Sequence, residues 1–285
     1  MKKSGLVLEG GAMRSVFTAG ILDSLMDQEI WFDEIYTMSA GAYAALNYIS
    51  GQKGRILKTN VEPLTNGDIY FGPKTFFTTG GNFFDMDKLF DIYPNKTVPF
   101  DYEKFFASKI KLITAVTDCK TGKAKYYDEY GDNKRLMKIM RASNSLPFIS
   151  RLVKIDDGHM VDGGMADPIP VYKAIDSGID KPVIVLTQNK DFRKKTTSKY
   201  GTLIRMIYWK YPKFRALLKN RPTRYNEVLD FIDEQEALGN MFVFRPLIPS
   251  LKNNENDVST LMDFYHHGYD MLKERATELK QFLEA

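Results

Sequence analysis

Two consecutive units of strand, small-residue turn and helix open the chain and constrain its fold more than any other feature. The run 6–8 (Leu-Val-Leu) has the composition of a short buried strand, and apolar side chains then recur at helical spacing over 16–26. A second strand is predicted at 34–38 and an alanine-rich helix at 40–49. Because two such units within fifty residues favour parallel strands joined by helices, we expect an α/β fold with a parallel sheet.

The remaining periodic segments continue this alternation to the end of the chain. Two short strands at 152–155 and 159–161 flank Asp156-Asp157-Gly158, which suits a tight hairpin because Asp and Gly tolerate positive φ. The other expected elements are strands at 110–116, 123–127, 183–187 and 241–244 and helices at about 134–142, 171–177, 225–238 and from Val258 onward. With 285 residues and no internal repeat, we expect one domain over 1–285.

Two regions of that domain differ from the rest. The segment at about 51–108 is loop-like and rich in aromatic residues, so we interpret it as an insertion over the core. Its aromatic side chains either form a small core of their own, which is the favoured interpretation, or line an acyl-chain pocket or lid. The second region is a basic helical C-terminal part at about 190–285.

Several features bear on the compartment and exclude whole classes of protein. No apolar run approaches the roughly 20 residues that cross a bilayer, and Leu6 to Leu8 is too short for the apolar region of a signal peptide. The single cysteine, Cys119, excludes an intrachain disulfide and a cysteine-based metal site. We therefore expect a cytoplasmic protein, with peripheral contact to a membrane as an addition considered below.

The first candidate for chemistry is Thr37-Met38-Ser39-Ala40-Gly41, at the junction of the second strand and its helix. A nucleophile elbow needs a sharp turn that exposes the serine hydroxyl and small residues after it, which Ala40 and Gly41 provide. The helix dipole would then favour negative charge at the reaction centre. Thr37 stands where the usual elbow has glycine, and a serine before a helix is more often a plain N-cap.

The second candidate is Gly10-Gly11-Ala12-Met13-Arg14, between the first strand and its helix. Backbone N–H groups in such a turn can bind an oxyanion, and glycines let the backbone approach a substrate closely. A dinucleotide or phosphate loop is the competing interpretation, but neither glycine pattern of those loops fits here. An ordinary tight turn between strand and helix is the other alternative.

The third candidate is Asp162-Gly163-Gly164, after the predicted hairpin. An aspartate before two glycines puts a carboxylate at a strand end, although a simple Asp-Gly turn has the same pattern. The chain has three histidines, His159, His266 and His267, and none has the context of a triad histidine. The remaining choice is a Ser-Asp dyad, in which Asp162 accepts the proton of Ser39 directly.

The three motifs together resemble the patatin-like phospholipase family in its bacterial branch. The similar segments are 9–14 with Thr18 and Gly20, 38–42 (Met-Ser-Ala-Gly-Ala), and 161–164 (Val-Asp-Gly-Gly) followed by Pro168-Ile169-Pro170. Further similar positions are Ala142-Ser143, Pro147-Phe148, Arg221 and Tyr225-Asn226. The resemblance therefore extends over most of the chain.

This resemblance implies a three-layer α/β/α sandwich with a mainly parallel central sheet, and a serine acyl hydrolase that cleaves lipid esters, phospholipids above all. It implies Ser39 as nucleophile and Asp162 as base, without metal or cofactor. The implied oxyanion loop consists of Gly10, Gly11, Ala12, Met13 and Arg14, the elbow includes Met38, Ala40 and Gly41, and Gly163 and Gly164 adjoin the base.

Two other functions remain open. Ala12 and Ser15 replace two glycines of the family's loop, and with Thr37 they motivate a catalytically weakened protein that binds lipid or a membrane surface. The same catalytic residues would also support acyl transfer to an acceptor other than water.

Positive charge is concentrated in one part of the chain. The segment 190–225 carries twelve Lys and Arg and one acidic residue, a net +11, whereas the remainder is −7 because the total is +4. Within it, 203–218 mixes aromatic and apolar residues with cations, which is typical of either an interfacial helix or a helix packed on the core, with Pro212 as a break or kink. We expect contact with anionic membrane through about 193–224 as one interpretation, and no nucleic acid, because no nucleic-acid module accompanies the charge.

Overall fold

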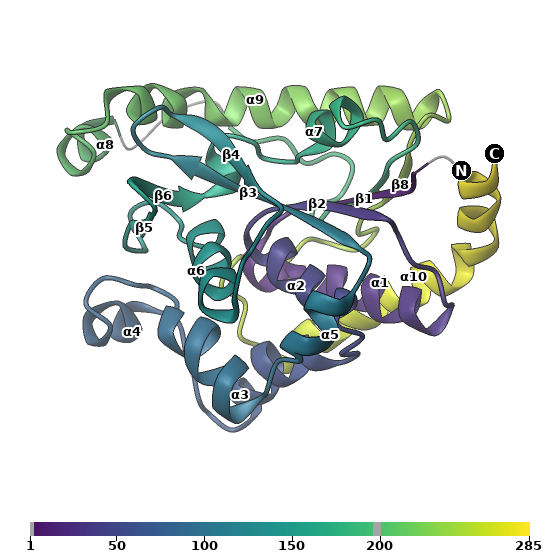
Figure 1. The fold of residues 1–285 in the computed structure, drawn as a ribbon, viewed down its shortest axis with the longest axis horizontal. Helices are drawn as coiled ribbons and strands as arrows, with labels where there is room; N and C mark the ends of the chain where they lie inside the picture. The colour runs from purple at the N-terminus through teal and green to yellow at the C-terminus, as the bar shows by residue number, and fades with distance from the viewer. Residues whose placement is uncertain (1–2, 196–200) are drawn as a thin grey trace.

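The two units expected at the start of the chain form β1 (Gly5–Leu8), α1 (Ser15–Asp27), β2 (Glu34–Thr37) and α2 (Ser39–Ile49). The computed structural model describes residues 3–195 and 201–285. Part of the expected basic segment, 196–200, therefore lies outside the described residues. In Figure 1 the strands run through the middle of the molecule with helices above and below them.

The strands belong to one sheet with the order β5-β6-β3-β2-β1-β7-β8, and β4 pairs with β3 beside this path. The neighbours β3-β2, β2-β1, β1-β7 and β7-β8 are parallel, whereas β4, β6 and β5 add antiparallel pairs at one side. The additional strands are β3 (Lys111–Asp118), β4 (Lys123–Tyr127), β5 (Val153–Ile155), β6 (Gly158–Asp162), β7 (Val183–Val185) and β8 (Phe242–Phe244). The mainly parallel sheet is thus confirmed.

Side chains alternate between the two faces of the sheet and give it a core on each side. Leu6 and Leu8 pack into the larger core with α1, α2, α6 (Asn133–Ser143) and α10 (Val258–Glu284). Val7, between them, packs into a second core with α7 (Val171–Asp176) and α9 (Pro212–Ala237). The alternation follows from the two-residue period of a strand. It produces the three layers of an α/β/α sandwich, with α7 and α9 above the sheet in Figure 1.

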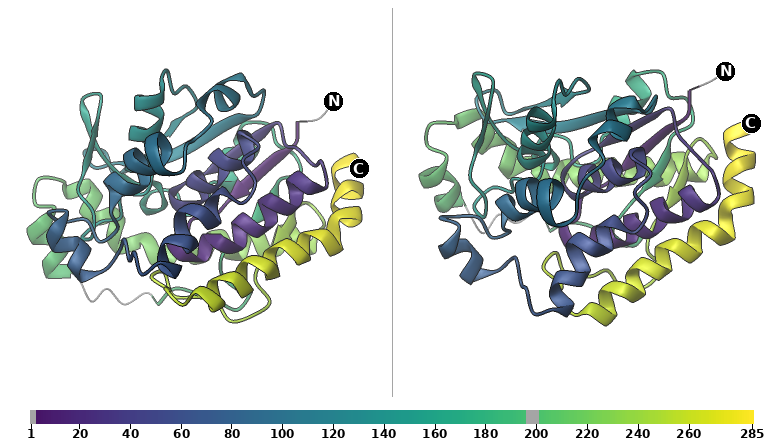
Figure 2. Two further views of the ribbon diagram at one scale, coloured as in Figure 1. Left: turned by 90° about the horizontal axis from the view of Figure 1, so that it is seen from below. Right: turned by 60° about the horizontal axis from the view of Figure 1, so that its bottom comes forward.

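Helices α1 and α10, from opposite ends of the chain, lie side by side in both views of Figure 2. Their contact depends on two glycines. A Cβ on Gly20 would lie 2.1 Å from the Tyr265 carbonyl oxygen, and a Cβ on Gly268 would lie 2.3 Å from the Phe17 carbonyl oxygen. Any other residue at either position would force the two backbones apart.

We expect Gly20→Ala to destabilise the protein by about 1–3 kcal/mol, as overpacking does. Alanine is the better helix former by about 0.5–1 kcal/mol, so an isolated helix would show the opposite sign. Urea unfolding of wild type, Gly20→Ala and the reciprocal Gly268→Ala measures the effect. An unchanged or higher midpoint in both variants would contradict this close packing.

The aromatic insertion contains α3 (Glu62–Thr65), α4 (Pro73–Thr78), α5 (Tyr102–Ala107) and two π-helical turns, Leu57–Val61 and Lys88–Thr97. Tyr70, Phe90 and Phe100 are buried in the same large core as α1 and α2. The expectation of a separate small core is therefore wrong, because the insertion folds onto the helices that cover the sheet. Some of its aromatic side chains also line a pocket, as described below.

The helix boundaries in the basic region differ from those expected. The run 203–218 is not one helix, since α8 (Gly201–Ile207) ends before Pro212 and α9 begins at that proline. Proline suits the first turn of a helix because its missing N–H has no partner there. The expected start at Tyr225 is also wrong, because α9 continues through Pro222. Contacts of the neighbouring Arg221, described below, hold that stretch in place.

Within residues 3–195 and 201–285, no helix combines the length and apolar character that crossing a membrane requires.

Candidate active site

Ser39 occupies a strained turn between β2 and α2. Met38 is extended, with φ −155° and ψ 166°, and Ser39 then adopts φ 54° at the start of the helix. The left-handed region costs a non-glycine residue roughly 1–2 kcal/mol, and such strain is characteristic of functional turns. A strand, a left-handed serine and a helix in this order have the backbone geometry expected of a nucleophile elbow.

A second serine holds this turn in place. The N–H of Ser39 donates to Oγ of Ser143 at 2.9 Å, and the Ser143 hydroxyl donates to the Ala115 carbonyl at 2.8 Å. All of these groups are buried. Ser143 therefore links the elbow to β3, a role that no spacing rule in the sequence suggested, although Ala142-Ser143 belonged to the family resemblance.

Ser143→Ala is expected to lower the free energy of unfolding by about 1–3 kcal/mol, because the buried Ser39 N–H would lose its partner. Ser50→Ala is a matched control: Ser50 is equally buried, but its hydroxyl donates within its own helix end. Urea unfolding of the two variants compares the costs. Equal losses would contradict a special role for Ser143.

The glycine-rich turn, residues 10–14, lies directly against the elbow. A Cβ on Gly10 would approach Cβ of Ser39 to 2.6 Å, so only glycine permits this contact. Within the described part of the chain, the N–H groups of Gly10, Gly11 and Ala12 donate no hydrogen bond. These donors are available to an oxyanion beside Ser39.

The structure accommodates the three residues that depart from the family pattern, Ala12, Ser15 and Thr37. Ala12 adopts φ 50°, and the Ser15 hydroxyl donates to the Ala12 carbonyl at 2.7 Å, which supports the strained residue. Thr37 is fully buried and donates from Oγ1 to the Leu8 carbonyl at 3.2 Å. Its Oγ1 lies 2.7 Å from where a Cβ on Gly41 would be, so the glycine makes room for it.

Glu9 fixes the glycine-rich turn to the rest of the protein. Its Oε2 accepts from the Thr187 N–H at 2.7 Å, and its Oε1 accepts from the Tyr225 hydroxyl at 2.6 Å. Arg14, at the end of the turn, lies with Nε 3.5 Å from Oγ1 of Thr187. Helix α9 and the segment that follows β7 therefore both position the turn.

Asp162 ends β6 and is buried beside the elbow. Its Oδ1 accepts from the Gly164 N–H at 2.8 Å, whereas Oδ2 has no partner of normal hydrogen-bond geometry in the described part of the chain. Met38 connects the two motifs, because its Cβ lies 2.9 Å from where a Cβ on Gly163 would be. The structure thus brings Ser39 and Asp162 together across Met38.

The environment of Asp162 raises its pKa, because burial disfavours the carboxylate. The Ser39 hydroxyl lies close enough to oppose this effect, as do the Gly164 N–H and the positive charges of Arg221 and Lys194. A base with a raised pKa accepts a proton more readily than an ordinary aspartate.

Two arginines of α9 hold the turn after Asp162. Arg221 donates from Nε to the Gly164 carbonyl at 2.8 Å, and Arg224 donates to the Met165 carbonyl at 2.7 Å.

Nζ of Lys194 lies 3.6 Å from the ring centroid of Tyr225. Burial, reinforced by Arg221, lowers the pKa of Lys194 to about 7. Sequence reasoning gave Lys194 no role, since nothing local marks it.

A largely apolar pocket opens beside the Ser39 hydroxyl. Both Ser39 and Ala12 line it, and the aromatic insertion supplies one wall. The remaining lining residues are Met13, Ala40, Tyr43, Asn60, Tyr70, Phe84, Met86, Leu89, Phe90, Asn144 and Leu146. Such a lining suits a hydrocarbon chain.

The three histidines lie elsewhere. The His159 ring lies tilted against that of Tyr211, the His266 ring lies edge-on to that of Tyr265, and His267 accepts from the Leu247 N–H at 3.0 Å. Within residues 3–195 and 201–285, no three His, Cys, Asp or Glu side chains gather as metal ligands would. The Asp162 carboxyl group lies beside Ser39, as do the N–H groups of residues 10–12, which donate no hydrogen bond in the described part of the chain.

Comparison with known proteins gives the family. A model of the patatin-like phospholipase family matches residues 6–175, more than half of the chain, and this segment contains Ser39, Asp162 and the glycine-rich turn. The chain belongs to the patatin-like phospholipase family. The family resemblance drawn from the three motifs is therefore confirmed. A second model, a domain of unknown function named DUF6363, matches residues 211–284, which contain α9 and α10.

Two similar proteins illustrate the extent of these matches. The uncharacterized protein YjjU of Escherichia coli K12 is 30% identical in an alignment 195 residues long, which covers 64% of this chain and 51% of YjjU. The match thus spans about half the length of this relative. The crystal structure of VipD from Legionella pneumophila aligns with a TM-score of 0.47 and 12% identity, covering 96% of this chain and 66% of that chain.

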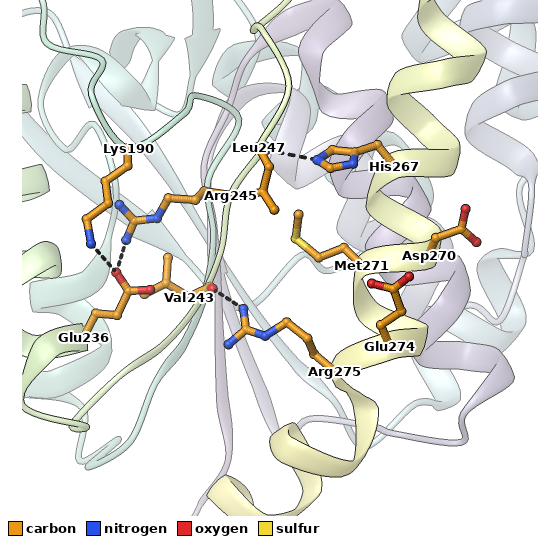
Figure 3. Close-up of a pocket in the computed structure, with 10 residues that line it drawn as sticks. All are labelled: Lys190, Glu236, Val243, Arg245, Leu247, His267, Asp270, Met271, Glu274 and Arg275. Atoms are coloured by element: carbon orange, nitrogen blue, oxygen red, sulfur yellow. Dashed lines mark hydrogen bonds and ion pairs between the residues drawn. The ribbon is translucent and has the colours of Figure 1, made fainter.

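A different pocket lies between β8 and α10 and shares no lining residue with the pocket of Ser39 (Figure 3). Arg245 pairs with Asp233 and Glu236, and Arg275 donates to the Val243 carbonyl at 3.0 Å. Its lining residues are Lys190, Glu236, Val243, Arg245, Leu247, His267, Asp270, Met271, Glu274 and Arg275. Because these arginines already have partners, the pocket is best understood as the seam between α9, β8 and α10.

Proposed function

We propose that this patatin-family protein hydrolyses carboxylic esters of lipids through a Ser39-Asp162 dyad. The observation that carries the proposal is the left-handed Ser39 beside a buried carboxylate whose Oδ2 lacks a hydrogen-bond partner in the described residues. Ser39 Oγ attacks the ester carbonyl while Asp162 accepts its proton. The N–H groups of residues 10–12 stabilise the oxyanion, and the helix dipole of α2 adds to them.

Ser39 and Asp162 also carry out the remaining steps, which are formation of the acyl-enzyme and its hydrolysis. Asp162 returns its proton to the leaving alcohol as the tetrahedral intermediate collapses to an acyl-enzyme on Ser39. Water then attacks the acyl carbonyl while Asp162 accepts its proton, and Asp162 returns this proton to Ser39 Oγ as the bond to the acyl group breaks and the carboxylic acid leaves. The apolar pocket beside Ser39 would hold the acyl chain.

The second candidate function is that of a catalytically weakened protein that binds lipid, and it is motivated by Thr37, Ala12 and Ser15. The hydrogen bond from Ser15 to the strained Ala12 and the room beside Gly41 for Thr37 favour a working site instead. Turnover of p-nitrophenyl butyrate by the purified full chain tests the choice. Release of nitrophenol above the level of a Ser39→Ala preparation supports hydrolysis, and equal rates would reject it.

The raised pKa of Asp162 predicts the acid limb of activity. Asp162 must be ionised to accept the serine proton, so kcat/KM should fall as the pH decreases through this pKa, above the ordinary aspartate value of about 3.9. The cations Arg221 and Lys194 face this carboxylate and moderate the shift. A pH profile with a soluble ester measures the limb. An acid limb at the ordinary pKa of aspartate would contradict a buried base with a raised pKa.

A further inference from the structure

Helix α8 and the turn after it expose an unusual number of large apolar side chains. Met206 and Trp209 are each 67% exposed, and Leu203 and Ile207 are also exposed. The same segment is anchored from its other side, because Ile204 and Tyr208 are buried and the Tyr208 hydroxyl accepts from the Phe148 N–H at 3.0 Å. The exposed side chains therefore project from a fixed element.

Helix α4 adds a further apolar side chain at the same end of the molecule, where Figures 1 and 2 place both α4 and α8. Phe77 of α4 is 80% exposed. The loop 146–151 contacts the segments that follow these two helices, since the Phe83 N–H donates to the Ile149 carbonyl at 2.7 Å and the Phe148 and Tyr208 rings lie 5.4 Å apart. We call Phe77, Leu203, Met206, Ile207 and Trp209 the apolar rim.

The loop 146–151 also reaches the candidate active site. Leu146, at the start of this loop, lines the pocket of Ser39, and so does Phe84, the neighbour of Phe83, whose N–H donates to that loop. A surface that covered the rim would therefore lie beside the pocket. This placement matters for a substrate that is itself embedded in a surface.

The charge around the α8 part of the rim is positive. No acidic residue occurs between Asp191 and Glu227, and Arg205, Lys210 and Lys213 are exposed beside the rim. Nζ of Lys210 lies 5.2 Å from the ring of Trp209. Apolar and aromatic side chains surrounded by cations complement the headgroups and acyl chains of an anionic lipid surface.

We propose that the apolar rim is the surface through which this protein docks on an anionic lipid bilayer, with Trp209 and Phe77 entering the headgroup region. The proposal narrows the membrane contact expected over 193–224 to α8, its following turn and, outside that segment, α4. Its benefit for catalysis rests on the proposed lipid-ester hydrolysis, because docking would place the pocket of Ser39 beside membrane substrates. Binding itself does not depend on that activity.

Sedimentation with vesicles tests the docking surface directly. Wild type should bind vesicles of phosphatidylcholine and phosphatidylglycerol more strongly than vesicles of phosphatidylcholine alone, and salt should weaken the difference. Met206→Ser combined with Trp209→Ala should reduce the partition coefficient about tenfold or more. Lys210→Glu combined with Lys213→Glu should remove the preference for the anionic vesicles.

Trp31→Ala is the matched control, since Trp31 is 46% exposed but precedes β2 and lies at the amino end of the strands. It should bind vesicles like wild type. Equal binding by the Met206 and Trp209 variant, or an equal loss in Trp31→Ala, would overturn the proposal. So would a wild-type dimer in analytical ultracentrifugation that the same rim substitutions dissociate, because the rim would then be covered by a second copy.

Rates on a soluble ester and on phospholipid vesicles distinguish a failure of docking from a failure of the proposed hydrolysis. The rim variant should turn over a soluble short-chain ester at the wild-type rate but hydrolyse phospholipid in anionic vesicles about tenfold more slowly. Absence of wild-type turnover on the soluble ester would reject the proposed hydrolysis while leaving vesicle binding as the measure of docking. An unchanged vesicle rate in the rim variant would reject docking as the route to substrate.

Discussion

Replacing Ser39 with alanine is expected to reduce kcat for short acyl esters by about 10⁴-fold or more, because no other hydroxyl takes the position of the nucleophile. The substitution leaves the N–H that donates to Ser143 and the backbone of the elbow in place. Initial rates with p-nitrophenyl butyrate measure the loss, with Ser50→Ala as a buried serine control outside the site. Turnover near the wild-type rate in Ser39→Ala would reject Ser39 as nucleophile.

A companion variant separates loss of chemistry from loss of structure. Ser39→Gly should be equally inactive but at least as stable as wild type in urea, because glycine adopts φ 54° without the cost that serine carries. An inactive and strongly destabilised Ser39→Gly would indicate that the side chain supports the fold instead.

Asp162→Asn is expected to reduce kcat by about 10⁴-fold, since an amide cannot accept the serine proton. The amide oxygen can still accept from the Gly164 N–H, so the turn should persist. Initial rates on the soluble ester check this. Wild-type-like turnover would show that another group acts as base.

The same variant should be more stable than wild type at neutral pH. Burial raises the pKa of Asp162 in the folded protein, so ionisation of this carboxyl group opposes folding above that pKa. The advantage of Asp162→Asn should shrink as the pH falls through the folded pKa towards the unfolded value of about 3.9, where the wild-type side chain is also neutral. Urea unfolding at several pH values measures it. A less stable variant at pH 7 would mean that Arg221 and Lys194 more than offset the burial.

The parts of the fold that the sequence predicted well are those with local causes. The strands near residues 6–8 and 34–38, the hairpin at 156–158 and the helix at 134–142 each follow from a periodic pattern or a turn signal. Helix α9 is different, because Pro222 argues locally against a helix that crosses it. Arg221, Arg224 and Tyr225 stabilise that stretch through contacts with distant residues, which no local pattern contains.

The candidate site likewise contains residues with a local sequence signal and residues without one. Ser39, the glycine-rich turn and Asp162 each carry a short motif, so the sequence could nominate them. The supports of these motifs come from far along the chain: Ser143 is 104 residues from Ser39, and Tyr225 is 216 residues from Glu9. Only the packed sheet brings such pairs together, which is why their roles needed the structure.

The contacts of α9 and α10 also bear on how the chain is organised. Both helices lie in the segment that matches the domain of unknown function, 211–284. Yet α9 holds the turn after Asp162, and α10 packs on α1 through Gly20 and Gly268. A single unit over 1–285 stays a prediction, and these contacts favour it because the turn after Asp162 would lose its support without α9.

Covalent labelling with a fluorophosphonate, followed by mass spectrometry of the modified peptide, tests the central claim most directly. Only an activated serine with a working oxyanion site reacts readily with this electrophile. We predict one adduct on Ser39 in the wild-type protein, none in Ser39→Ala and a strongly slowed reaction in Asp162→Asn. A folded wild-type protein that remains unlabelled at Ser39, or carries the label on another residue, would contradict the account.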